Sequence, residues 1–293
     1  MRLSALPCVL LLAFAVLVAR ADDTLDDFAR VRHGLAEDNP AELWVQRGAE
    51  LWHAPAGPRQ VPLELCDLGL GPGQVRGAFA QLPRWFDDAG QVMDIEQRLI
   101  WCMTTLQGLT AQEASRNHFG DGARQSPMEA LVAWLASQSR GMPVDVPATR
   151  PAEQRLLALG RRLFYYRAGP YDFACATCHS GQHLRIRLQE LPNLTDPGDA
   201  RRSFTTWPAY RLSQGGVRTL EHRLYDCFRQ QRFPEAVYGS DAITALTLLL
   251  AHTAQGRLGR CAVHQALTRA ASAGGVRQAA WPTCCRRPWC PSH

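Results

Sequence analysis

Hydrophobic positions recur with a helical period in several stretches of the chain. Residues 152–166 carry an apolar stripe with three- and four-residue spacing, which predicts an amphipathic helix. Residues 219–233 have the pattern of a second helix, and the apolar stretches 130–136 and 245–251 match each other as helical segments. These patterns predict a mainly α-helical protein.

The N-terminus has the pattern of a secretory signal peptide. Arg2 precedes an uninterrupted apolar run over residues 9–18, and Ala19-Arg20-Ala21 fits the small-x-small cleavage pattern. We therefore expect residues 1–21 to be removed before Asp22. The apolar run is shorter than the roughly 20 residues that a membrane span requires, so we expect an exported protein of the periplasm without a membrane span.

The strongest chemical motif is Cys175-Ala176-Thr177-Cys178-His179. Two thiols three positions apart can form thioethers to one haem, and the adjacent histidine can bind its iron, which is the c-type haem attachment pattern. A thioredoxin-like redox pair would need a strand before the motif, whereas the preceding segment has a helical pattern. A plain disulfide or another metal site are the remaining alternatives. The motif predicts one covalently attached haem c, with His179 as an iron ligand.

Matched positions indicate that the chain contains one module twice. Residues 95–102 align without a gap with residues 220–227, and residues 130–136 align with residues 245–251. The segment Leu63–Gly69 falls where Cys175–Gly181 would lie, with Asp67 in the place of the histidine. The three matched segments come in the same order in both halves of the chain, which predicts two cytochrome c-like helical domains. We expect a haem-free domain over residues 22–150 and a haem domain over residues 151–256.

Cysteine positions agree with this repeat. Cys66 stands at the second haem-attachment position of the first domain, and Cys102 matches Cys227 of the second. Without a haem between them, Cys66 and Cys102 can meet, so we expect a disulfide that closes a loop of about 36 residues and contributes roughly 3–4 kcal/mol.

The residues downstream of the haem motif narrow the choice of the second iron ligand. Methionine is common in cytochromes c, but no methionine comes after Cys178. Cys227, His222 and His252 remain, since His183 lies too close to His179 in sequence and belongs on the same side of the haem. Histidines on predicted helices, as both of these are, usually lie on the surface or form a hydrogen bond with a structural partner. The body of the chain keeps five cysteines, an odd number, and Cys227 is the one left over, which favours it as the ligand.

Composition changes this picture little. The chain has 293 residues, 46% of them hydrophobic and 20% charged, as in an ordinary globular protein. The net charge of +5 comes with scattered arginines and no basic stripe, so nucleic-acid binding is not expected. Residues 257–293 are rich in Arg, Ala and Cys without an apolar period, and we expect a divergent, disordered tail there; a small metal site is the less favoured alternative.

The chain resembles the SoxA family, the c-type cytochrome subunits of bacterial thiosulfate-oxidising complexes. The stretches that carry the resemblance are residues 66–73, 82–86, 165–167, 175–181, 227–232 and 238–240. The resemblance extends over most of the chain, up to Gly256. The chain is similar to the single-haem branch of the family, because other members carry a second attachment motif in the first domain.

The resemblance implies an enzyme, an L-cysteine S-thiosulfotransferase. Such a subunit pairs with a smaller monohaem cytochrome, SoxX, joins thiosulfate to a cysteine of the carrier SoxYZ, and passes two electrons to a soluble cytochrome c. The family's catalytic residue is a haem-ligating cysteine found as a persulfide, which maps onto Cys227. Arg223 lies one helical turn before it, where its cation would favour a thiolate and attract an anionic substrate. The alternative is a periplasmic cytochrome that only carries electrons.

Overall fold

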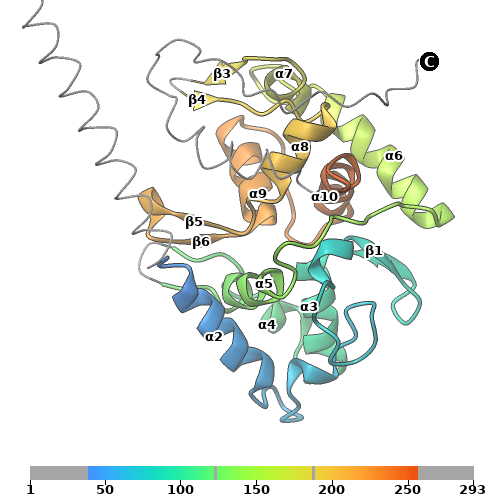
Figure 1. Ribbon diagram of the computed structural model, residues 1–293, viewed down its shortest axis with the longest axis vertical. Coiled ribbons are helices and arrows are strands. Elements are labelled where there is room, and N and C mark those ends of the chain that lie inside the picture. Colours follow the sequence, from blue (N-terminus) through green and yellow to red (C-terminus); the bar gives the residue numbers. More distant parts are fainter. Residues whose placement is uncertain (1–38, 122–123, 187–188, 257–293) are drawn as a thin grey trace, which may run out of the picture. The chain divides into compact units, whose positions relative to one another are not determined.

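Helices dominate the part of the chain that the structure describes, which confirms the mainly helical fold. The computed structural model describes residues 39–121, 124–186 and 189–256 (Figure 1). The signal peptide expected over residues 1–21 and the tail expected over residues 257–293 lie outside these residues. Among the described residues, no helix has both the length and the apolar character to cross a membrane.

Two series of elements succeed each other along the chain. The first consists of α2 (Glu42–His53), the hairpin β1 (Arg84–Phe86) and β2 (Gln91–Met93), α3 (Ile95–Thr105), α4 (Ala111–Ala114) and α5 (Pro127–Ser137). The second consists of α6 (Pro151–Tyr165), α7 (Cys175–His179), the hairpin β3 (Arg185–Ile186) and β4 (Gln189–Glu190), α8 (Pro197–Phe204), the hairpin β5 (Ala209–Arg211) and β6 (Gly216–Arg218), α9 (Leu220–Gln230) and α10 (Asp241–Thr253). Short 3-10 turns cover Leu63–Leu65, Phe79–Gln81 and Leu212–Gln214.

The two series repeat in detail. In the first hairpin Arg84 pairs with Met93, and in the second Ala209 pairs with Arg218, the matching positions. The helix after each hairpin begins with a polar cap, Asp94 before α3 and Thr219 before α9. The sequence interpretation did not include the hairpins, because strands of three residues give no readable alternation. We call the two series the first and the second repeat; the domain boundary expected at residue 150 falls between α5 and α6 and stays a prediction.

A glycine brings the paired helices together at the same place in each repeat. A Cβ atom on Gly48 of α2 would lie 2.0 Å from the carbonyl oxygen of Ala130 in α5. A Cβ on Gly160 of α6 would lie 2.2 Å from the carbonyl oxygen of Ala245 in α10. Ala130 and Ala245 are matched positions of the sequence repeat, so both repeats use one helix crossing that only glycine permits.

Each hairpin packs against the helices of the other repeat. Val92 and Trp85 of the first hairpin belong to an apolar cluster with Leu157 of α6 and Leu248 of α10. Val217 and Tyr210, the matching residues of the second hairpin, pack with Trp44 of α2 and with Ala130 and Ala133 of α5. The rings of Trp44 and Tyr210 meet edge to face with centroids 5.6 Å apart. The exchange buries apolar surface from both repeats in shared clusters, which stabilises them together.

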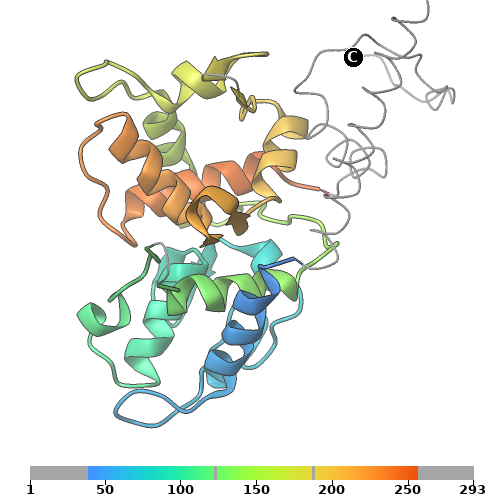
Figure 2. The same ribbon diagram turned by 90° about the vertical axis from the view of Figure 1, so that its left-hand side faces the viewer.

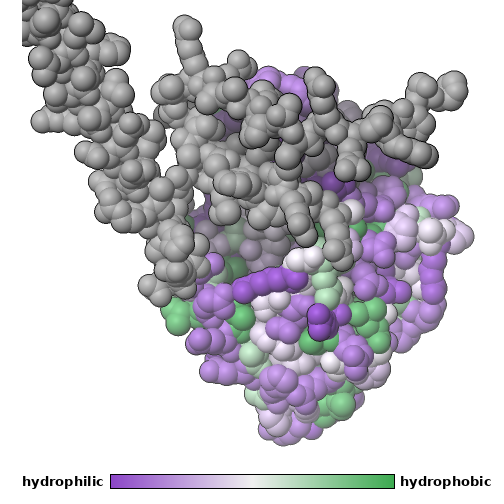
Figure 3. Space-filling model, in the orientation of Figure 1, coloured by the Kyte–Doolittle hydropathy of each residue, from purple (hydrophilic) through white to green (hydrophobic). Residues whose placement is uncertain are grey.

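A disulfide and large apolar side chains fill the core of the first repeat. Cys66 and Cys102 are joined, with their Cα atoms 5.6 Å apart, and both are buried. The surrounding core contains Trp52, Leu63, Leu68, Leu99, Trp134 and Leu135. On the face seen in Figure 3, hydrophobic residues are scattered in small groups among hydrophilic ones, as expected when the main apolar residues lie inside.

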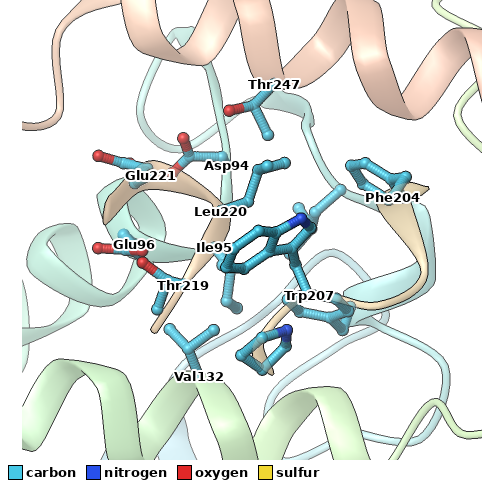
Figure 4. Close-up of a pocket in the computed structure, with 13 residues that line it drawn as sticks. Asp94, Ile95, Glu96, Val132, Phe204, Trp207, Thr219, Leu220, Glu221 and Thr247 are labelled. Atoms are coloured by element: carbon cyan, nitrogen blue, oxygen red, sulfur yellow. The ribbon is translucent and has the colours of Figure 1, made fainter. Parts of the chain in front are cut away.

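A cluster of buried carboxyl groups lies where the repeats meet. Asp94, Glu96 and Glu221 line a cavity of about 40 Å³, together with Phe204, Trp207 and Thr247. Figure 4 shows the acidic side chains on one side of this cavity and the two aromatic rings on the other. Glu96 and Glu221 are matched positions, and the hydroxyl of Tyr238 donates to Glu96 Oε2 over 2.6 Å. Three carboxyls this close and this deeply buried cannot all ionise at low cost.

The buried state of Glu96 predicts that stability falls as pH rises. Burial raises the pKa of Glu96 from an ordinary value of 4.5 to about 8, and the charges of Asp94 and Glu129 act in the same direction. Between these two values the unfolded chain releases the proton while the folded chain keeps it. The free energy of unfolding should therefore decrease by up to about 1.4 kcal/mol per pH unit for this group, measured by urea unfolding from pH 5 to 8.

Glu96→Gln provides the matched control, because it keeps the size of the side chain and cannot ionise. The slope of unfolding free energy against pH should be shallower in this variant than in the parent chain. Parallel slopes for the two proteins would show that Glu96 does not titrate in this range.

Candidate functional site

The two thiols of the haem attachment motif lie on one short helical turn. Helix α7 places Cys175 and Cys178 three residues apart, and neither is in a disulfide. The hydroxyl of Thr177 accepts a hydrogen bond of 2.9 Å from the backbone N–H of Ala174, which fixes the start of the turn. Both thiols are partly buried, on the same side of α7, as two thioethers to one planar ligand require.

His179 is held in one orientation by the backbone. Its Nδ1 lies 3.0 Å from the carbonyl oxygen of Pro192, and the backbone N–H of Leu194 donates to the His179 carbonyl over 2.8 Å. A proton on Nδ1, donated to Pro192, leaves Nε2 with its lone pair for a metal. Burial lowers the pKa of His179, and the positive charge of Arg223 acts in the same direction, so the neutral, ligating form is favoured.

Apolar side chains of α6, α7, α9 and α10 surround these groups. The cluster contains Phe164, Ala174, Ala176 and Leu246, with Leu163, Leu194, Leu224, Phe228 and Leu249 at its edge. Burial raises the pKa of the Cys175 thiol to about 11, and the nearby Cys227 adds to this increase. An apolar environment of this kind suits a porphyrin ring and does not suit an exposed, reactive thiol pair.

Cys227 reaches the same region from helix α9. Its thiol is not in a disulfide and is partly buried. Burial raises its pKa, the charge of Arg223 lowers it, and the charges of Asp226 and Cys178 raise it again. Leu224 and Phe228, which lie on either side of Cys227 in α9, belong to the same apolar cluster as Cys175, so α9 packs beside the attachment motif.

Arg223 and its counterpart Arg98 have the same place in the repeat but different surroundings. Arg98 donates to both carboxylate oxygens of Asp88 over 2.8 Å and to the carbonyl oxygen of Asp67 over 2.7 Å. Its side chain is only 2% exposed and its guanidinium lies 4.1 Å from the centre of the Phe86 ring. The three guanidinium nitrogens of Arg98 therefore all donate to structural partners, and Phe86 lies against the guanidinium group.

The side chain of Arg223 is 35% exposed, and its nearest carboxylate, that of Asp226, is 3.6 Å away. The residue that matches Asp88 in the second hairpin is Ser213, which has no carboxylate, so the bidentate ion pair of Arg98 has no counterpart at Arg223. Arg223 consequently has donors that an anion near Cys227 could use.

Asp226 links the arginines of helix α9. Its carboxylate accepts from Arg229 over 2.7 Å and from Gln230 over 2.9 Å. Although burial acts to raise the pKa of Asp226, the bond from Arg229 and the charges of Arg229 and Arg223 lower it. The sequence interpretation missed this residue, although its spacing of three from each arginine on a predicted helix was a usable signal.

The other histidines have structural partners. His222 Nδ1 lies 2.8 Å from Glu129 Oε1 and its ring stacks on Phe119 at 4.3 Å. His252 Nδ1 lies 3.0 Å from the carbonyl oxygen of Val146. His183 is exposed and forms an ion pair of 3.0 Å with Glu190. The structure thus packs α9, which carries Cys227 and Arg223, beside the start of α7, and gives these three histidines contacts elsewhere.

The residues present fit a c-type haem. Two unpaired thiols stand on one turn, the imidazole beside them has Nε2 available, and apolar side chains surround the group. Cys227 lies nearby on another helix, with a sulfur atom that is a suitable iron ligand. The first repeat offers none of this, since the disulfide and the side chains of its core occupy the corresponding space.

Known proteins share both the sequence and the fold of this chain. A family model described as the SoxA/TsdA cytochrome c domain matches residues 47–144. The L-cysteine S-thiosulfotransferase subunit SoxA of Hydrogenophilus thermoluteolus is 46% identical over 242 residues, which cover 80% of this chain and 88% of that protein. A protein of the same name from Hydrogenobacter thermophilus is 31% identical over 220 residues, which cover 74% of this chain and 78% of that protein.

Among solved structures, the crystal structure of SoxXA from P. pantotrophus matches with a TM-score of 0.60 and 30% sequence identity, over 75% of this chain and 76% of that chain. A cytochrome c domain implies haem c, and the attachment motif on α7 lies in the second repeat, outside the residues that the family model matches. The chain therefore belongs to the SoxA family of cytochrome c subunits of L-cysteine S-thiosulfotransferases.

Proposed function

We propose that the chain is the catalytic subunit of a periplasmic haem enzyme that conjugates thiosulfate to a cysteine of a SoxYZ-like carrier protein. The outer sulfur of thiosulfate forms a bond to the carrier sulfur, and the reaction releases one proton and two electrons. The electrons leave through the haem to a soluble cytochrome c. The observation that carries the proposal is the packing of α9, which bears the unpaired Cys227 and the partly exposed Arg223, on the apolar cluster that contains Cys175.

In this proposal Cys175 and Cys178 would attach one haem, and His179, through Nε2, and Cys227 would bind its iron. The haem supplies a one-electron acceptor beside the reacting sulfur. The thiolate of Cys227 would form a bond to the outer sulfur of thiosulfate as two electrons leave, and the carrier thiolate would then take over that sulfur, with the Cys227 thiolate as the leaving group. Support comes from the unpaired state of the three cysteines and from the bond that orients His179.

Arg223 binds the sulfonate group of thiosulfate in this proposal. A guanidinium offers several donors in a plane, which suits an oxyanion, and its charge favours the thiolate of Cys227. The loose 3.6 Å pairing with Asp226 leaves donors free, in contrast to Arg98 in the first repeat.

We further propose that the subunit works in a heterodimer with a SoxX-like monohaem cytochrome and is exported to the periplasm through its signal peptide. The match to a structure titled SoxXA supports the heterodimer. The cleavage pattern at Ala19-Arg20-Ala21 supports export.

The purified, matured chain should contain one haem. One complete attachment motif is present, and in the first repeat Leu63 and Asp67 occupy two of the three positions that attachment requires. Haem absorbance in alkaline pyridine, divided by protein concentration, should give a ratio of about one. A ratio of two would show a second attachment site in the first repeat.

Cys227→Ala should abolish thiosulfate-dependent turnover, with a loss of at least about a hundredfold, because it removes the nucleophile. The haem should remain attached, since Cys175 and Cys178 are unchanged, and the low-spin signal of the ferric iron should change. Turnover at the parent rate with an unchanged spectrum would leave the chain as an electron carrier only.

Cys227→Met separates the two roles of this residue. A thioether can bind the iron but cannot form a persulfide, so this variant should exchange electrons with a cytochrome and still fail to conjugate thiosulfate. Conjugation by the methionine variant would show that Cys227 acts only as an iron ligand.

Arg223→Gln should raise the KM for thiosulfate by roughly tenfold or more, the loss expected when a charge-assisted hydrogen bond is removed. Arg229→Gln is the matched control, because Arg229 lies on the same helix, pairs with the same Asp226 and is more exposed. Steady-state kinetics should show a change of less than about twofold in this control. Equal effects of both substitutions would mean that only the net charge of α9 matters.

A further inference from the structure

Three tyrosines stand exposed directly before the haem-attachment motif. Tyr165 is 59% exposed, Tyr166 is 66% exposed and Tyr171 is 47% exposed. Large aromatic side chains normally bury most of their surface, so a group of three on one short stretch of chain needs a reason. The other exposed apolar side chains, such as Leu43 and Leu212, are distant from these tyrosines in sequence.

These tyrosines are tied to the haem site by short connections. Phe164, the residue before Tyr165, is buried against Ala174 and Ala176 beside the attachment thiols. The backbone N–H of Ala168 donates to the carbonyl oxygen of Phe173 over 2.8 Å, which closes the loop that carries Tyr171 just before Cys175. The stretch 165–172, which connects α6 to α7 (Figure 2), is therefore largely exposed and short enough to stay close to the attachment motif.

Positive charge surrounds the tyrosines. The helical period places Arg161 one turn before Tyr165, and Arg162 one turn before the C-cap residue Tyr166, and these four side chains are exposed. Arg155, two turns before Arg162, is exposed as well, and the Arg232 guanidinium carbon lies 5.6 Å from the centre of the Tyr171 ring. Within the described residues, Arg155, Arg161, Arg162 and Arg232 have no carboxylate partner, and Arg167 pairs with Asp172 at 2.9 Å.

We propose that this face, made of Tyr165, Tyr166, Tyr171, Arg161 and Arg162, is the docking surface for a small electron-transfer protein with an acidic patch around its own cofactor. The proposal rests on the proposed function, in which electrons must leave the haem. Tyrosine and arginine are the residues that contribute most to protein interfaces. Electron-transfer partners use small interfaces whose association is guided by complementary charge. Arginines that have no carboxylate partner among the described residues therefore favour a negatively charged partner protein.

The test measures electron transfer from the dithionite-reduced haem of the full chain, alone and with its second subunit. Oxidised plastocyanin, an acidic copper protein, is the probe, and each event moves one electron from ferrous iron to Cu(II). The double variant Arg161→Glu/Arg162→Glu should lower the second-order rate constant in stopped flow by at least about tenfold at low ionic strength. The difference should largely disappear at about 0.5 M salt, where surface charges are screened.

Arg76→Glu/Arg116→Glu is the matched control, since it makes the same change in net charge at exposed positions of the first repeat. It should change the rate constant by less than about twofold. Tyr166→Ser should slow the reaction with a weaker dependence on salt, because it removes contact area and leaves the charge unchanged.

Three results would overturn the proposal. Equal slowing by the control pair would show an effect of net charge alone, and an unchanged rate in the α6 variant would show that the partner docks elsewhere. Loss of co-purification with the second subunit would show that the face is the subunit interface. The measurement needs neither thiosulfate nor Cys227, so a failure of the conjugation chemistry would leave its outcome unaffected.

Discussion

The exchange of hairpins between the two repeats is the packing on which the other features depend. Val92 lies against α6 and α10, while its counterpart Val217 lies against α2 and α5. Each hairpin leads directly into the helix that carries the matched arginine and cysteine, so the position of α9 at the haem site is set by contacts made with the first repeat. Arg218 at the end of β6 and His222 on α9 both bond to the buried Glu129 of α5, which fixes that helix further.

The two repeats show how one framework supports two chemistries. In the first repeat, Arg98 donates hydrogen bonds to Asp88 and to the backbone of Asp67, and Cys102 forms a disulfide. In the second, the corresponding arginine keeps free donors and the corresponding cysteine keeps its thiol. The matched positions differ at Asp88, which is Ser213 in the second repeat, and at Asp67, which is His179 there.

Much of the candidate site could be predicted from the sequence. The attachment motif, the matched cysteines and the absence of a later methionine indicate the candidate haem ligands without coordinates. The expected helix over residues 152–166 agrees with α6 to within one residue, whereas α9 ends at Gln230, three residues before the expected end, where the backbone of Arg232 takes a left-handed φ of 54°. The hairpin exchange could not be predicted, because residues such as Trp85 and Glu153 bond across long stretches of chain that carry no local pattern. The buried carboxyl cluster was missed for the same reason: Glu96 and Glu221 are polar residues near helix starts, and only tertiary packing buries them.

The disulfide in the first repeat bears on how the protein is assembled. Since Cys66 and Cys102 close that core without a cofactor, α2 and α5 can present their apolar surface to β5 and β6 before any haem is bound. The first repeat can thereby act as an internal template for the packing of the second.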